Sequence, residues 1–246
     1  MKLYLSLTHP QNQQISEIAN TIKEYYPVGL EVNSEGYKSY PGIINLDNTI
    51  GQHMTHYNAY IAPWRSFLKS LPKGFKSKIH NCGFAHQTSY GGELLLEKHE
   101  DKVLIRKKKL IFNVSWLGNF YTIYGVDETF VLDKKAMGEF DLHYHAINVI
   151  TVSPHKEFEN GFNYLQTAIN KQFVDYKFIP FKLCSFYIKD LQTPYSYPNE
   201  ATVYNAIFNE SLDRVHLPSI YLRGDRRYGL EPGDTKVRLL LPPKST

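Results

Sequence analysis

Seven consecutive residues alternate between ionisable and apolar side chains: Glu139, Phe140, Asp141, Leu142, His143, Tyr144 and His145. Successive side chains of a β-strand point to opposite faces, so a strand here would place the two carboxylates and the two imidazoles on one face. Imidazole and carboxylate groups together can hold zinc, iron or manganese, or can transfer protons. This row is the strongest chemical motif in the chain.

The row predicts a metal site formed by His143, His145 and Asp141. Ligands on one straight strand spread too far apart for all of them to reach a single ion, so a complete site needs a further side chain. Such a side chain could come from elsewhere in the chain, for example from His53, His56, His80 or His86. The competing interpretation is a solvent-facing amphipathic strand, which alternates in the same way and binds nothing.

A second motif lies near the end of the chain, where the segment 221–229 has the sequence Tyr-Leu-Arg-Gly-Asp-Arg-Arg-Tyr-Gly. Arginine binds phosphate and carboxylate groups through its planar fork, and tyrosine can stack on a flat ligand. We therefore predict a partner-binding or phosphate-binding surface formed by Arg223, Arg226, Arg227 and Tyr228. An exposed turn with scattered charge is the alternative, because nearby acidic residues dilute the positive field.

Three consecutive lysines, Lys107, Lys108 and Lys109, lie between two apolar runs of one expected strand. Consecutive residues of a strand face opposite sides, so the lysines predict a segment that is wet on both faces. Lysines on an edge strand discourage association between sheets, and we expect that role here.

Composition limits the classes of protein to consider. The 246 residues are 42% hydrophobic and 21% charged, which indicates a globular fold rather than disorder. The net charge of +4 is too small to favour nucleic acid as a partner. The two cysteines form no CxxC pair, which argues against a disulfide framework or a zinc ribbon and favours a reducing cytoplasm. No stretch approaches the roughly 20 apolar residues of a membrane span.

The periodicity predicts an α+β fold with a largely antiparallel sheet. We expect one domain over residues 1–246, with two strand–helix–strand units in halves 1–135 and 139–246 that could be related. The expected elements are a strand at 2–8, a helix from residue 10, a strand at 28–32, a helix at 49–71 kinked at Pro63, an antiparallel meander over 79–132, a strand at 147–152, a helix from Ser153, a strand at 177–188 and a last strand at 236–241.

The chain lacks the P-loop, the dinucleotide-binding glycine motif, the nucleophile elbow and the kinase signatures. The aromatic content of 14%, with 19 tyrosines, suits a binding surface as well as strands. We therefore predict a cytoplasmic, bacterial-type protein-binding module without a cofactor, for example an immunity protein or inhibitor that neutralises a toxin. The alternative is a metal-dependent hydrolase or nuclease that uses the His-x-His strand, so an enzyme and a divalent metal both remain open.

Overall fold

The computed structural model describes residues 4–5, 13–76, 78–82, 84–133, 142–194, 196, 200–208 and 221–225. The helices are α1 (Gln13–Tyr25), α2 (Glu35–Lys38), α3 (Pro41–Thr55), α4 (Tyr57–Ser70), α5 (Lys73–Lys76), the 3-10 turn η1 (Lys156–Phe158), α6 (Glu159–Gln172), α7 (Phe181–Cys184) and α8 (Val203–Ile207). The strands are β1 (Tyr4–Leu5), β2 (Ile79–Asn81), β3 (Ser89–Glu100), β4 (Leu104–Ser115), β5 (Phe120–Asp133), β6 (Leu142–Thr151), β7 (Lys177–Phe178), β8 (Tyr187–Ile188) and β9 (Tyr221–Arg223).

The main sheet has seven strands, with β2-β3-β4-β5-β6-β9 in order and β7 beside the start of β5. Strands β2 to β6 pair antiparallel, whereas β7 and β9 join parallel to β5 and β6. A separate small sheet pairs β1 with β8. The predicted α+β class with a mostly antiparallel sheet is confirmed, and so is the meander that the turns over 79–132 predicted.

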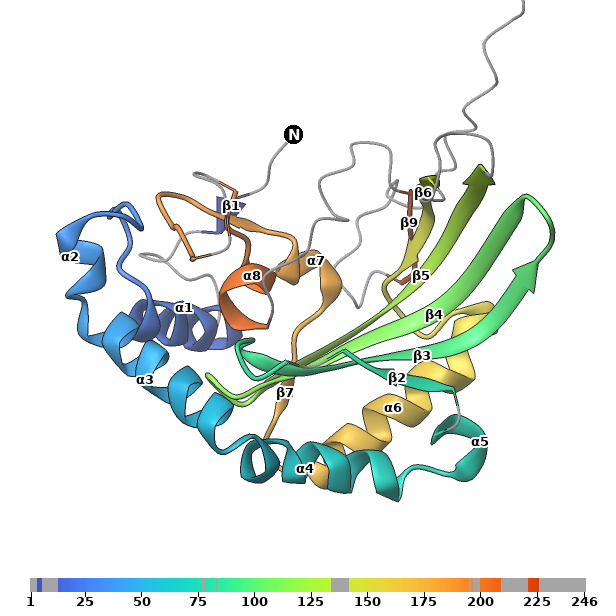
Figure 1. Ribbon diagram of the computed structural model, residues 1–246, viewed down its shortest axis with the longest axis horizontal. Helices are drawn as coiled ribbons and strands as arrows, with labels where there is room; N and C mark the ends of the chain where they lie inside the picture. The colour runs from blue at the N-terminus through green and yellow to red at the C-terminus, as the bar shows by residue number, and fades with distance from the viewer. Residues whose placement is uncertain are drawn as a thin grey trace, which may run out of the picture.

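Helices cover both faces of the sheet at one end (Figure 1). Below the sheet in that view, α4 and α6 pack against it through stripes at helical spacing, such as Phe162, Leu165 and Ile169 of α6, which are all 0% exposed. Above it lie α1, α7 and α8, whose buried residues join those of α3 in a second cluster. Each face of the sheet therefore has its own apolar core.

The other end of the sheet extends past this packing and curves (Figure 1). Two register shifts lie where the two parts meet. One falls between Leu95 and Glu97 of β3, and the other falls between Asp127 and Glu128, where β5 pairs with β6. Both shifts lie at the level of Lys108 of β4, which pairs with Glu97 of β3 and with Asp127 of β5. A β-bulge bends the strand and increases its twist, which accounts for the curvature at this position. We call the two parts the inner and outer halves of the sheet.

Several expected elements differ from the structure. Residues 28–32 form turns instead of a strand, because Gly29 has φ +88° and its N–H donates to the Asp190 carbonyl rather than to a neighbouring strand. The long helix expected at 49–71 is two helices that meet at His56, which has non-helical φ and ψ of −111° and 43°, and α4 runs through Pro63.

The second strand–helix–strand unit also differs in detail. Its helix α6 begins at Glu159 after the η1 turn, later than Ser153 suggested, and α7 interrupts the strand expected at 177–188. The strand expected at 236–241 lies outside the described residues. The relation between the halves 1–135 and 139–246 stays a prediction. None of the helices in the described ranges is long and apolar enough to cross a membrane.

Candidate functional site

The last four residues of the ionisable row, 142–145, lie on β6 and are within the described residues. Glu139 and Asp141 lie outside the described residues, and for His143 the structure describes the backbone, which pairs with Leu132 of β5. His145 pairs with Phe130 of β5 and has a described side chain. The predicted metal site of His143, His145 and Asp141 therefore stays a prediction, and His145 is the member whose side-chain contacts the structure describes.

Two groups of β5 hold the His145 ring. Its Nε2 lies 3.0 Å from Oε2 of Glu128, and its ring stacks on Phe130 with 4.4 Å between centroids and 4° between planes. A carboxylate that accepts from one imidazole nitrogen fixes the ring and leaves the other nitrogen as the acceptor. In the neutral ring with Nε2–H donating to Glu128, Nδ1 is the atom that can take a proton or a metal ion.

Glu128 is the centre of an ion-pair network. Its side chain is 1% exposed, and its Oε1 lies 2.8 Å from the Nζ of Lys109. The same ammonium donates to both carboxylate oxygens of Glu93, at 2.9 and 3.0 Å. Lys109 therefore bridges two carboxylates from β3 and β5. A buried carboxylate without such partners would carry a large desolvation cost.

The burial of Lys109 corrects the prediction made from the three lysines. Strand β4 lies in the middle of the sheet, with β3 on one side and β5 on the other, so these lysines are not on an edge. Lys109 is 7% exposed and points to one face. Lys108 points to the other face and pairs with Glu97 and Glu157, at 2.7 and 3.2 Å.

Lys107 completes the arrangement on the His145 face. Its ammonium lies 5.1 Å from the centroid of the Phe130 ring, in the geometry of a cation–π contact. Contacts therefore run without a break across four strands, and we call these six residues the ionic–aromatic cluster: Glu93, Lys107, Lys109, Glu128, Phe130 and His145. Its two lysines and two glutamates balance in formal charge.

A second set of charges occupies the opposite face of the outer half. The Arg106 guanidinium donates to both carboxylate oxygens of Asp127, at 3.0 and 2.6 Å, and Asn148 of β6 donates to the same carboxylate at 3.0 Å. Burial by itself would raise the pKa of Asp127. The hydrogen bonds from Arg106 and Asn148 outweigh burial and hold the pKa of this carboxyl below its usual value.

The predicted phosphate-binding surface is described only in part. Arg223 lies on β9, and its Nη1 is 4.0 Å from Oε1 of Glu157, which Lys108 also contacts. Arg226, Arg227 and Tyr228 lie outside the described residues. Arg223 therefore faces a carboxylate that it shares with a lysine, and the binding of phosphate or a partner by the four residues stays a prediction.

The histidines considered as completing ligands lie on other elements. His53 of α3 packs against Tyr60 and Trp116, at centroid distances of 4.2 and 4.7 Å, and burial lowers the pKa of its ring. His56 lies at the α3–α4 junction and His80 on β2. Across the part of the chain that the structure describes, no three His, Cys, Asp or Glu side chains gather closely enough to hold a metal ion.

Sequence reasoning missed the partners of His145. Glu128, Lys109 and Glu93 are 15 or more residues from each other along the chain, and only the strand register brings them together. The signal that could have found them is an acidic residue within an apolar strand, because a carboxylate there needs a cation from the neighbouring strand.

Comparison with protein-family models, with curated proteins and with solved structures finds no significant match to this chain.

Proposed function

We propose that this protein is a binding module that recognises another protein through the outer end of its sheet, as an inhibitor or an immunity protein does when it covers a toxin. The observation that carries the proposal is the exposure of apolar side chains there. Val103 is 61% exposed and Val131 is 39% exposed. Val131 pairs across the strands with Leu104 on one face of the sheet, and Phe130 pairs with Ile105 on the other face. Apolar residues exposed together are typical of interaction surfaces.

The surroundings of this apolar end support an acidic partner. Lys107 lies over Phe130 on one face, and Arg106 is 52% exposed on the other. Aromatic and arginine side chains are enriched in protein interfaces. The Arg106–Asp127 ion pair and the contact of Lys107 with Phe130 are formed within the sheet, so fewer side chains lose freedom on binding. An apolar contact ringed by carboxylates on the partner would complement this end, and the net charge of +4 favours its approach.

The test is a comparison of single variants of the full chain as bait in an extract of its native host, with quantitative mass spectrometry as the readout. Val131→Asp places a charge in the proposed contact and should remove a captured protein that the unchanged chain retains. Val174→Asp is the matched control, because Val174 is 68% exposed and follows α6 on another part of the surface. Lys107→Glu should weaken capture of the same protein and reduce its dependence on salt.

Capture that survives both Val131→Asp and Lys107→Glu would contradict the proposal, as would equal loss with Val174→Asp. All variants should first give the melting temperature of the unchanged chain within a few degrees, so that loss of capture reports the surface and not unfolding.

A second function, that of a metal-dependent hydrolase or nuclease, is favoured by the Glu128–His145 pair. A metal-bound histidine commonly donates its other ring N–H to a carboxylate, and Glu128 is placed for that role 3.0 Å from Nε2. Here His143, His145 and Asp141 would bind the ion, and Arg223, Arg226 and Arg227 would hold a substrate phosphate. Stoichiometric zinc, iron or manganese in the purified protein, lost in the His143→Ala/His145→Ala double variant, would favour this function over the binding module.

A further inference from the structure

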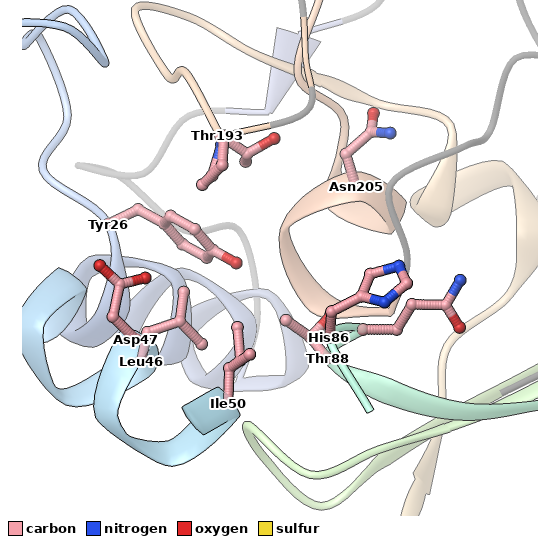
Figure 2. A pocket seen from close by; sticks show the side chains of 10 residues that line it. Tyr26, Leu46, Asp47, Ile50, His86, Thr88, Thr193 and Asn205 are labelled. Atoms are coloured by element: carbon pink, nitrogen blue, oxygen red, sulfur yellow. The ribbon is translucent and has the colours of Figure 1, made fainter. Parts of the chain in front are cut away.

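A small cavity lies at the inner end of the molecule, where α1, α3 and α8 approach the beginning of β3 (Figure 2). Its volume is about 70 Å³. The Tyr26 hydroxyl points toward the space between Ile50, Thr193, Asn205 and His86 (Figure 2). The elements that meet here are distant in the sequence, so the cavity is a property of the folded chain.

One polar group of the lining has no partner within the described structure. The Oγ1 of Thr88 is buried and makes no hydrogen bond to any described residue, and Thr88 as a whole is 9% exposed. A buried hydroxyl without a partner is unfavourable, and most buried polar atoms in folded proteins are satisfied by protein, water or a ligand. Thr88 lines the cavity, so a molecule placed there could supply the missing hydrogen bond.

The other lining groups limit the charge of that molecule. Of the described residues that line the cavity, none is lysine or arginine, so an anion would find no permanent cation there. Asp47, the lining carboxylate, is exposed to solvent, and a buried cation needs a buried counter-charge to offset its loss of water. The hydroxyls of Tyr26 and Thr88 can each donate and accept. A neutral hydroxylated molecule matches this lining.

Size and the apolar side chains limit the ligand further. Leu46 and Ile50 of α3 provide an apolar side to the cavity. An apolar cavity of about 150 Å³ accepts benzene, so about half that volume accommodates roughly three to five heavy atoms. We propose that this cavity binds a short neutral alcohol or diol, whose hydroxyl bonds to Thr88 Oγ1 and whose carbon chain packs on Leu46 and Ile50.

The proposal can be tested by titrating the ¹⁵N-labelled full chain with propane-1,2-diol, with acetate and with ethylammonium as probes of equal size class. We expect saturable amide shifts at Thr88 and Asn205 with the diol, and no saturable shifts there with either ion. Thr88→Val keeps the shape and removes the hydroxyl, and it should weaken diol binding at least tenfold. Thr151→Val is the matched control, because Thr151 is also buried with an unpartnered Oγ1 but does not line the cavity.

A third variant, Ile50→Phe, should fill the space and abolish the diol shifts while the remaining spectrum stays dispersed. Three results would overturn the proposal: shifts that never saturate, as expected where ordered water alone fills the cavity; binding of either ion as tight as that of the diol; or equal weakening by Thr88→Val and Thr151→Val.

Discussion

The inner and outer halves of the sheet are built from the same strands and are stabilised in different ways. In β4, residues 110–115 are all buried between the two helical layers. Residues 104–109 instead begin with two apolar side chains and continue with four basic side chains that form ion pairs or a cation–π contact. The inner half gains stability by removing apolar surface from water. In the outer half, charged groups of neighbouring strands satisfy one another, and such networks contribute less net stability than apolar packing.

The two ends of one long strand can therefore have different roles. The helix-covered part buries the apolar side chains of both cores and should contribute most of the stability. The extended part presents side chains that the ion pairs hold in place, at the end where we propose that a partner binds. Substitutions in the inner half should therefore mainly lower the free energy of unfolding, and substitutions at the outer end should mainly weaken binding.

The largest difference is expected between two phenylalanines. Phe112 of the inner half is 0% exposed and packs against Trp64 and Phe67, so Phe112→Ala should lower the free energy of unfolding by about 3–5 kcal/mol. Phe130 of the outer half is partly exposed and gains mainly its contacts with His145 and Lys107, so Phe130→Ala should cost about 1 kcal/mol. Urea denaturation monitored by circular dichroism measures both, and similar losses would refute the division into halves.

Substitutions in the buried ion pairs should change the free energy of unfolding in a strongly non-additive way. Glu128→Leu removes one carboxylate from Lys109 and should cost about 3 kcal/mol, toward the lower end for a broken buried pair, because Glu93 still binds the ammonium. In the Lys109→Met/Glu128→Leu double variant both charges of the most buried pair are gone and the Glu93 carboxylate, which is 25% exposed, can be hydrated, so most of that loss should be recovered. A double-mutant cycle in urea gives the coupling, and additive losses would show that the network acts through packing instead.

A smaller loss of stability is expected at low pH, when Asp127 becomes protonated. The folded-state pKa of Asp127 lies below its unfolded value of about 3.9. Its contribution to stability is therefore complete well above the unfolded pKa, at about pH 5 and higher, and is lost as the pH falls through the lower, folded pKa. Because the pair with Arg106 is partly open to solvent, the contribution should be about 1 kcal/mol or less. The difference in unfolding free energy between the unchanged chain and Asp127→Asn should shrink between pH 5 and pH 2, and a constant difference would contradict this account.

Features that depend on local patterns were predictable from the sequence. Alternation and turns located the meander, and helical spacing located α6 through Phe162, Leu165 and Ile169. Predictions failed where long-range contacts decide the conformation. The strand expected at 28–32 has apolar residues at the right spacing, but no neighbouring strand pairs with it within the described residues, and Gly29 turns toward Asp190.

The candidate site shows the same limit. The alternation around His145 was visible, but its partners come from β5 and, through Lys109, from β4 and β3. Which residues meet across strands is set by register, and no local pattern reveals the register of strands that include bulges. A lysine in a run of three gave no sign that one member would be buried between two carboxylates.

The two bulges have a consequence for how the chain finds this register. A strand that slips by one residue exchanges its two faces, and here a slip of β4 would turn Lys109 toward the aromatic layer of α4 and α6. Leu96 on β3 and Asn148 on β6 are the unpaired bulge residues, and they lie at the same level of the sheet. A shift in register of β4 or β5 would therefore have to shift the positions of both bulges. The bulges thus favour one register of the four long strands. In that register Glu93, Lys109, Glu128 and His145 are in contact.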